Sequence, residues 1–374
     1  MAPPKQIETN GLHPADALTR VITGLLDDSP CYVAFSGGCD SSLVLGAATA
    51  ACRATGHPDP IPVTYRYSAP DTDESSFQEA VVRRLGLGEW TKLDFGVDGD
   101  LLSPSTCEEL LIGGPMWPPA PLSRARALRG LAAGLWLSGE GGDEVLGPRR
   151  TSYADRALRM WAQRPYRPPA SLLRAGIVEL APRPLRVRAA EHALARNYRA
   201  DWLDADLRRR YFRDSATLAA SEPLRPARWF GHYLSRPSVK VGHAAIRAFK
   251  ARLGLRWEAP LVNPQFLGAL AGTVRWHEYR GRRHLLRTLF SDLLPDEIID
   301  RRTKVAFNSA FFGPYTREFA KGWDGTGTPA GVKGEWLKSH WQSDQISAGT
   351  APLLHHVWLA TQQSSSALGG ARCR

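Results

Sequence analysis

The sequence lacks any long hydrophobic run, although 43% of its 374 residues are hydrophobic. A helix that crosses a membrane needs roughly 20 consecutive apolar residues, and no segment approaches that length. The opening residues, Met-Ala-Pro-Pro-Lys, also lack the apolar core of a signal peptide. We therefore expect a cytoplasmic protein that makes no contact with a membrane.

Cysteine is scarce, with five residues in the chain, and none is arranged as C-x-x-C. No histidine lies at the spacing of a zinc finger. A scattered, odd set indicates reduced thiols, and it argues against a disulfide framework or a structural zinc ion. The cysteines are Cys31, Cys39, Cys52, Cys107 and Cys373.

Lysine is also scarce, with 8 residues against 40 arginines, and the net charge of +11 is unevenly placed. Residues 149–256 carry a net charge of +16, whereas the rest of the chain carries −5. Such asymmetry can mark a surface for an acidic partner. A coding bias toward arginine would explain the same excess of arginine over lysine. A binding surface for an acidic partner and a coding bias therefore both stay open.

Short apolar runs alternate with segments of helical periodicity up to about residue 150. We expect strands over residues 31–35, 61–67, 90–95 and 135–137. We expect helices over residues 13–26, 41–55, 77–85 and 125–133. This alternation predicts an α/β fold with a doubly wound parallel sheet.

Strand-like runs largely disappear after residue 147, and helical segments rich in Arg, Ala and Leu follow. We therefore divide the chain into four parts. They are a disordered lead at residues 1–11, an α/β part at 12–150, a mostly helical part at 151–363 and a disordered tail at 364–374.

The first motif is Ser36-Gly37-Gly38-Cys39-Asp40-Ser41-Ser42, between an expected buried strand and a helix. Glycines let the backbone turn tightly and approach a ligand, and the helix that follows begins with free N–H groups. Together they predict a phosphate cradle, in which Asp40 can hold a magnesium ion. The motif is not a Walker loop, because no lysine follows the second glycine.

The second motif is Ser138-Gly139-Glu140-Gly141-Gly142-Asp143-Glu144, again directly after an apolar strand. The three acidic side chains repel one another, and the three glycines lose more backbone entropy on folding than other residues would. A cation or a proton transfer that uses the acids would account for that cost.

The first motif is similar to the PP-loop of the ATP pyrophosphatases, and the pair of motifs resembles the synthetase domain of the asparagine synthetases. Three further segments are similar to K-x-x-L-R, L-P-x-x-I/V and R-x-K-x-x-F stretches of that family. They are residues 283–287, 294–299 and 301–307. The resemblance implies a PP-loop α/β fold with a helical C-terminal part, and it spans roughly residues 13–312.

The resemblance assigns roles by matching position, with ATP and magnesium as the bound groups. Asp40 and Asp143 would bind magnesium, Glu140 would be the base, and Lys304 would stabilise charge on the acyl-adenylate. The pyrophosphate cradle would comprise Ser36, Gly37, Gly38, Ser41 and Ser42. The residues beside the nucleotide would be Ser138 and Gly139, with Phe35 and Tyr65 flanking the adenine.

Three departures from the family pattern bear on the substrate. Residue 2 is Ala, where full-length members carry the cysteine nucleophile of a glutaminase domain. The second motif continues as Gly147-Pro148-Arg149-Arg150 in place of Gly-Gly-Tyr. The R-P-F-L-D segment reads Ala259-Pro260-Leu261-Val262-Asn263, so we expect the substrate to be held differently.

We therefore expect an AMP-forming carbon–nitrogen ligase that joins a small-molecule or peptide carboxylate to an amine, as β-lactam synthetases and lasso-peptide macrolactam synthetases do. The amine would come from ammonia, a separate ammonia donor or the substrate itself. Three alternatives stay open: ammonia-dependent asparagine synthesis, a PP-loop enzyme that modifies tRNA, and a non-catalytic regulatory relative. The acidic second motif and the lack of paired catalytic cysteines argue against a nucleic-acid substrate.

Overall fold

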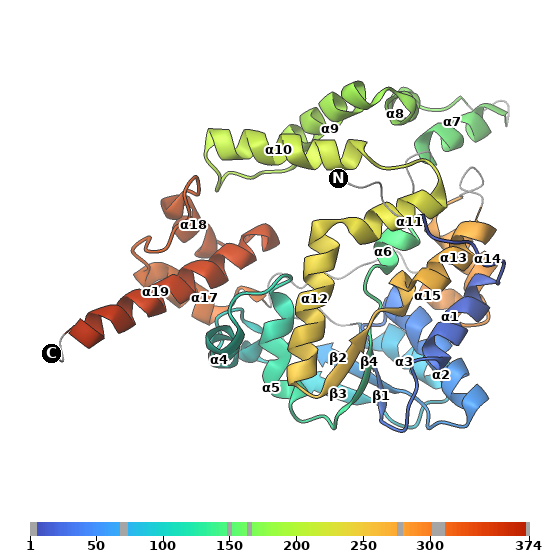
Figure 1. Ribbon diagram of the computed structural model, residues 1–374, viewed down its shortest axis with the longest axis horizontal. Coiled ribbons are helices and arrows are strands. Elements are labelled where there is room, and N and C mark those ends of the chain that lie inside the picture. Colours follow the sequence, from blue (N-terminus) through green and yellow to red (C-terminus); the bar gives the residue numbers. More distant parts are fainter. Residues whose placement is uncertain are drawn as a thin grey trace.

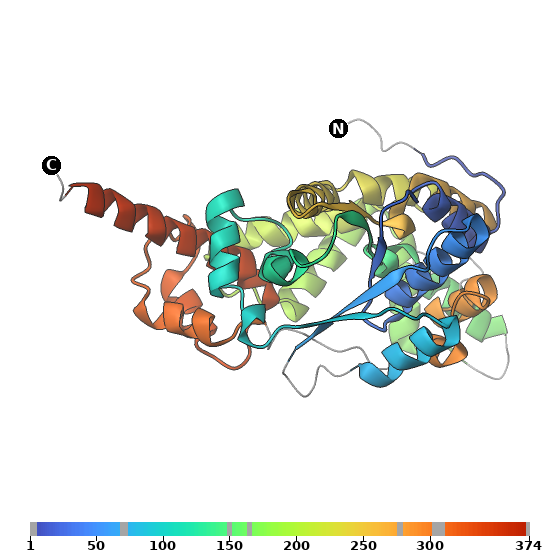
Figure 2. The same ribbon diagram turned by 90° about the horizontal axis from the view of Figure 1, so that it is seen from below.

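A computed structural model describes residues 6–67, 74–147, 152–162, 167–274, 280–300 and 311–371 of the chain. Its centre is a five-stranded, all-parallel sheet in the order β3-β2-β1-β4-β5, with helices on both faces (Figures 1 and 2). The strands are β1 (Cys31–Ala34), β2 (Ile61–Arg66), β3 (Thr91–Asp94), β4 (Gly134–Leu137) and β5 (Leu255–Glu258). The doubly wound α/β fold expected from the sequence is confirmed.

The helices of the first part of the chain cover this sheet and link its strands. They are α1 (Pro14–Thr23), α2 (Cys39–Thr55), α3 (Ser75–Leu85), α4 (Pro104–Gly113), α5 (Ala125–Leu128) and α6 (Gly142–Val145). Both β1 and β4 are apolar and buried, as strands covered on two faces should be. The helix expected over residues 125–133 stops after a single turn at Leu128, and Gly130 follows closely.

Strand β5 is a correction to the sequence prediction, which placed the last strand at residues 135–137. It pairs in parallel with β4, and Gly134 lies opposite Leu255. Its sequence, Leu-Arg-Trp-Glu, buries Leu255 and Trp257 and exposes Arg256, as an edge strand does. A segment of the expected helical part therefore completes the sheet.

The second half of the chain is otherwise helical. Its helices are α7 (Ser152–Ala162), α8 (Ala170–Leu180), α9 (Arg183–Asn197), α10 (Ala205–Ala220), α11 (Pro226–Ser235), α12 (Pro237–Arg252), α13 (Pro264–Thr273), α14 (Arg282–Phe290), α15 (Asp296–Ile299), α17 (Pro314–Gly322), α18 (Gly334–Trp341) and α19 (Ala351–Ala371). In Figure 1 the helices α7–α10 form a layer at the edge of the molecule farthest from the sheet.

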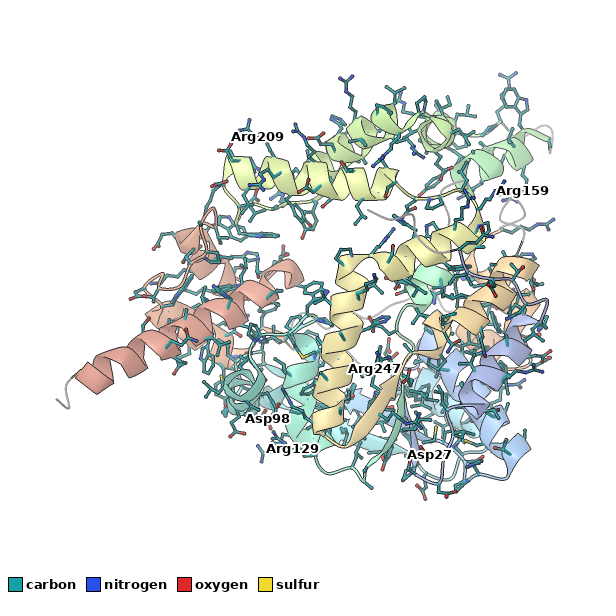
Figure 3. All side chains as sticks on the ribbon, in the orientation of Figure 1. Asp27, Asp98, Arg129, Arg159, Arg209 and Arg247 are labelled. Carbon is teal, nitrogen blue, oxygen red and sulfur yellow. The ribbon has the colours of Figure 1, made fainter. Side chains whose placement is uncertain are left out.

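This outer layer carries much of the positive charge of the chain. Helix α9 is rich in arginine and buries none of its residues. Figure 3 shows many side chains projecting from the layer into solvent, with Arg159 on α7 and Arg209 on α10 labelled. Residues 152–220, which span this layer, carry a net charge of +7, and residues 221–256 carry a further +7, so the charge asymmetry of the sequence extends beyond the layer.

A second hydrophobic core lies beside the sheet, among α17, α18 and α19. Trp323, Trp341 and Leu354 are buried in it, together with Leu101 and Leu110 from the α4 region. The buried carboxylate of Asp100 accepts hydrogen bonds from the Thr316 backbone N–H (3.0 Å) and hydroxyl (2.6 Å). Segments from both sides of residue 150 therefore build this core.

Both ends of the described chain differ from the expected disordered lead and tail. The Ile7 N–H donates to the Ala227 carbonyl (3.1 Å), and the Asn10 amide donates to the Gln265 carbonyl (2.8 Å). At the other end α19 continues to Ala371 and extends away from the body of the molecule (Figure 2). Within the described ranges, every helix is too short or too polar to cross a bilayer.

Replacing Trp341 by Ala should destabilise the protein by about 3–5 kcal/mol, because a fully buried indole leaves a cavity. The change also removes the hydrogen bond from the Trp341 ring N–H to the Thr350 hydroxyl (3.0 Å). Urea unfolding followed by circular dichroism measures the loss. Trp161→Ala is the control, since that side chain is 63% exposed and its removal should cost less than about 0.5 kcal/mol. Equal losses in the two variants would contradict the assignment of this core.

Candidate active site

The site is positioned by the pairing of β1 with β4 in the middle of the sheet. The chain adds β2 and β3 on one side of β1, and β4 and β5 on the other. Parallel strands end at the same edge, and a crevice opens there where the winding changes direction. Tyr32 pairs with Trp136 in this register, so the segments after both strands emerge side by side.

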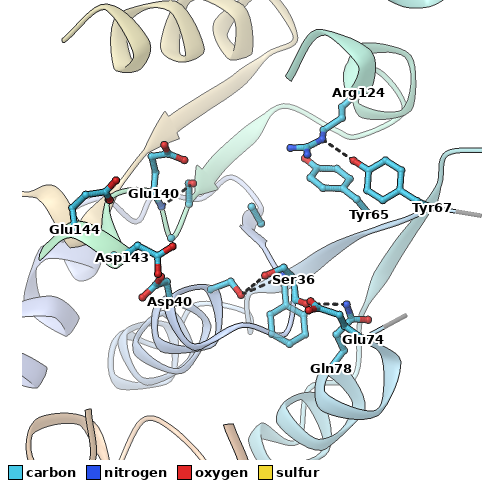
Figure 4. Close-up of a pocket in the computed structure, with 17 residues that line it drawn as sticks. Ser36, Asp40, Tyr65, Tyr67, Glu74, Gln78, Arg124, Glu140, Asp143 and Glu144 are labelled. Atoms are coloured by element: carbon cyan, nitrogen blue, oxygen red, sulfur yellow. Dashed lines mark hydrogen bonds between the residues drawn. The ribbon is translucent and has the colours of Figure 1, made fainter. Parts of the chain in front are cut away.

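A cavity of about 360 Å³ lies at this edge (Figure 4). Residues from both motifs line it, together with side chains from β2, α3 and the 3-10 helix η3 (Ala120–Arg124). The lining residues that the sequence had singled out are Phe35, Ser36, Asp40, Ser41, Tyr65, Ser138, Gly139, Glu140 and Asp143.

The first motif folds into a tight loop closed by its own hydroxyl groups. The Ser41 hydroxyl accepts from the Ser36 N–H (3.2 Å) and donates to the Gly38 carbonyl (3.1 Å). Gly37 has φ +81°, and a Cβ there would lie 2.8 Å from the Gln78 side chain, so only glycine fits. The loop leads into the 17-residue helix α2, whose N-terminus favours an anion.

The glycines of the second motif let its backbone pack directly on the first. A Cβ on Gly139 would lie 2.9 Å from the Ser41 nitrogen, and one on Gly142 would collide with the Asp40 carboxylate. Gly141 has φ +81° and starts the turn into α6. The two motifs, about 100 residues apart in sequence, therefore form one structural unit.

The two predicted metal ligands converge on a single cation, the guanidinium of Arg282 at the start of α14. One terminal nitrogen of Arg282 pairs with Asp40 and the other pairs with Asp143. Burial alone would lower the pKa of Arg282, but the two carboxylates outweigh burial and raise it. The geometry thus brings Asp40 and Asp143 within reach of one positive charge.

This arrangement fits a magnesium ion bound with phosphate. Magnesium in nucleotide sites takes one or two protein carboxylates and completes its shell with phosphate oxygens and water. Among the described residues, no group of three or more His, Cys, Asp and Glu side chains is arranged to hold a metal. Asp40 and Asp143 would therefore hold magnesium only together with a nucleotide, with Arg282 moving aside or sharing the charge.

Glu140 lines the cavity, and its side chain is exposed there. Burial raises the pKa of Glu140, the Glu144 carboxylate raises it further, and the Arg124 guanidinium partly offsets both. A raised pKa makes a carboxylate a stronger base. Glu140 therefore suits the transfer of a proton from an amine.

An aromatic wall closes the other side of the cavity. The Arg124 guanidinium lies 4.4 Å from the centre of the Tyr65 ring, and its Nε donates to the Tyr67 hydroxyl (3.2 Å). Tyr65 also stacks on Trp136, with ring centres 6.5 Å apart. Because Arg124 covers one face of Tyr65, an adenine could stack on that face only after Arg124 moved.

Some of the residues predicted from the sequence lie away from the cavity or outside the described ranges. Gly37 and Gly38 shape the loop without lining the cavity. Ser42 is fully buried in α2, and its hydroxyl lacks a hydrogen-bond partner within the described structure. Its side chain points away from the cradle, because one residue along a helix turns the side chain by about 100°. Lys304 lies in residues 301–310, which are outside the described residues.

The substitution of Asn263 for the family's acid has a structural explanation. Its side-chain oxygen accepts a hydrogen bond from the Gln265 N–H (2.9 Å) and caps the N-terminus of α13. The preceding Val262 packs on Gly141, in the second motif. Asn263 is therefore used in capping a helix and does not line the cavity.

Sequence reasoning missed Arg282, Arg124 and Gln78. Arg282 stands one residue before the segment compared with K-x-x-L-R, and many arginines surround it in sequence. Gln78 donates from its amide to the Ser36 carbonyl (3.1 Å), a contact between distant residues. No local pattern marks such contacts, because they depend on how the elements pack.

Comparison with known protein families shows to which family the chain belongs. The family model described as asparagine synthase matches residues 15–327, which is most of the chain. The chain belongs to the asparagine synthase family. That match covers both motifs, the strand β5 and the helix α14, so the family explains the site as a whole and makes the protein an ATP-dependent ligase. No curated protein sequence matches the chain.

Gly142→Ala should weaken the binding of magnesium and ATP, because the new methyl group displaces the Asp40 carboxylate. A misplacement of about 1 Å in such a site can cost about 10²-fold, so we expect at least a tenfold loss of affinity. Calorimetric titration with magnesium and a non-hydrolysable ATP analogue measures it. Gly88→Ala is the control, since nothing lies within 4 Å of a Cβ there. Unchanged affinity in Gly142→Ala would show that Asp40 is not a ligand.

Proposed function

We propose that this member of the asparagine synthase family activates a carboxylate as an acyl-adenylate and transfers the acyl group to an amine, on a specialised metabolite or a peptide. The observation that carries the proposal is the convergence of Asp40 and Asp143 on one cation at the edge of the β1–β4 pair. A cation site beside the phosphate cradle suits ATP bound through its phosphates.

The reaction balances in two steps. A carboxylate oxygen of the substrate attacks the α-phosphorus of ATP, forming the acyl-adenylate and releasing pyrophosphate into the cradle of Ser36, Gly38 and Ser41. The amine nitrogen then attacks the acyl carbon, Glu140 accepts a proton from that nitrogen, and AMP leaves with the bond electrons. Bound magnesium would neutralise phosphate charge during the first step.

The electrostatics of the described residues support this assignment of Glu140. Its raised pKa lies nearer to neutrality than that of an ordinary glutamate, so it gains more from taking up a proton. Glu140 also lines the same cavity as the phosphate cradle, between the acidic pair and Arg124 (Figure 4). An amine substrate that reaches the acyl group would therefore meet this carboxylate.

The nucleotide product tests the proposal most directly. Attack at the α-phosphorus gives AMP and pyrophosphate, whereas attack at the γ-phosphorus gives ADP and phosphate. We expect AMP and pyrophosphate in equal amounts when the protein is incubated with ATP, magnesium, candidate acids and amines. Chromatography of the nucleotides measures the products. Accumulation of ADP in place of AMP would exclude the adenylation step, and Asp143→Asn serves as the control for contaminating activities.

Lys304, matched to the family's R-x-K-x-x-F stretch, would stabilise the negative charge that develops as the acyl-adenylate forms and breaks down. Lys304→Ala should lower kcat by roughly 10²-fold, the scale for losing one preorganised donor. Lys304→Arg should also fail, because a planar guanidinium does not replace a compact ammonium. Steady-state kinetics beside calorimetric ATP titration separates kcat from binding. Near-normal kcat in Lys304→Arg would remove Lys304 from the mechanism.

A further inference from the structure

Arg124 belongs to neither motif, yet it is the only basic side chain among the described residues that line the cavity. It comes from the short 3-10 helix η3, before strand β4. Five acidic residues line the same cavity: Asp40, Glu74, Glu140, Asp143 and Glu144. Figure 4 shows Arg124 beside Tyr65 and Tyr67, across the cavity from Asp40 and Asp143.

Arg124 is held in place by aromatic groups and not by a carboxylate. Its Nε donates to the Tyr67 hydroxyl, and the plane of the Tyr65 ring lies against its guanidinium. Within the described residues it forms no ion pair, although Glu140 is near enough to feel its charge. With Nε engaged, the two terminal nitrogens are the part of the guanidinium left for another partner.

A second basic side chain contacts the same aromatic wall. Lys250 of α12 is 4% exposed, and its side-chain nitrogen lies 3.7 Å from the centre of the Trp136 ring. Trp136 in turn stacks on Tyr65, so Lys250 and Arg124 each contact one ring of the same stacked pair. As for Arg124, no described carboxylate forms an ion pair with Lys250. Burial and the Arg124 charge both lower the pKa of Lys250.

A sheltered cation without a carboxylate partner is unfavourable unless an anion joins it. Such an anion can reach Arg124, which lines the cavity, whereas Lys250 does not line it. The terminal nitrogens of a guanidinium match the two oxygens of a carboxylate. The phosphates of the nucleotide have their own cradle at the N-terminus of α2, on the opposite side of the cavity.

We propose that Arg124, supported by Tyr67, binds a second carboxylate of the acid substrate, one that is not activated. The inference rests on the proposed function, since it assumes that an acid enters this cavity. It restricts the substrate to acids with at least two carboxylates, such as a dicarboxylic acid or a peptide with a free carboxylate besides the reacting one. Arg124 then determines specificity and orients the reacting carboxylate toward the nucleotide.

Binding of small acids tests this without turnover. The probes are succinate and succinamate, which have the same shape but differ by one carboxylate, in the presence of magnesium and α,β-methylene-ATP. Calorimetry should show that the wild-type protein binds succinate at least tenfold more tightly than succinamate. Arg124→Gln should weaken succinate binding by about 10- to 100-fold and bring the two acids to similar affinities. Arg124→Lys should keep part of the preference, because its charge remains.

The matched control is Arg126→Gln, two residues along the chain, where an exposed arginine pairs with Asp98 outside the cavity. It should keep the full preference for succinate, and all variants should keep the wild-type affinity for α,β-methylene-ATP. Three results would overturn the proposal. They are a wild-type protein without preference for succinate, an unchanged preference in Arg124→Gln, and a loss of nucleotide affinity in Arg124→Gln that exceeds the loss for succinate. Because the binding assay needs no reaction, ADP as the product would refute adenylation and leave this test intact.

Discussion

The parallel pairing of β1 with β4 is the constraint on which the rest of the structure depends. It places the ends of two buried strands side by side, at the spacing of about 4.8 Å that neighbouring strands keep, and both motifs start from those ends. Glycines then let the two loops touch, since a side chain at Gly139 or Gly142 would strike the first motif. The position of the site is thus set by the pairing of β1 with β4. Its acidic side chains are brought together because the backbones of the two motifs lie in contact.

Crowding acids in this way has an electrostatic cost that the fold must offset. Like charges at close range disfavour one another, and burial adds to the penalty. The structure offsets it with the positive end of α2 and with Arg282, which pairs with Asp40 and Asp143 at once. A guanidinium carries one charge, whereas two carboxylates carry two. The guanidinium therefore leaves one carboxylate charge of the pair uncompensated, as the proposed magnesium site requires.

The sequence was sufficient to predict four of the five strands and the two loops, because local patterns encode them. Buried parallel strands read as short apolar runs, and glycines mark the turns that follow. Strand β5 escaped prediction since its alternating Leu255, Arg256 and Trp257 resemble the surrounding arginine-rich helices. Arg282 contacts partners 242 and 139 residues away, and no local pattern records such contacts. The role proposed for Lys304 came from the family resemblance and stays a prediction.

The cavity has two parts whose side chains come from different elements of the fold. These two parts differ in how easily a substitution is tolerated without disturbing the sheet. Glu140 stands on the loop after β4, and Asp40 and Asp143 stand in the first turns of α2 and α6, so the β1–β4 pair positions all three. Arg124 ends the 3-10 helix η3, which packs on α4 and α5 and is not part of the sheet. In the proposed reaction, nucleotide chemistry would therefore depend on the sheet, and selection of the acid would depend on an element outside it. A family that shares one sheet can accept different acids by varying such elements, without rebuilding the phosphate site.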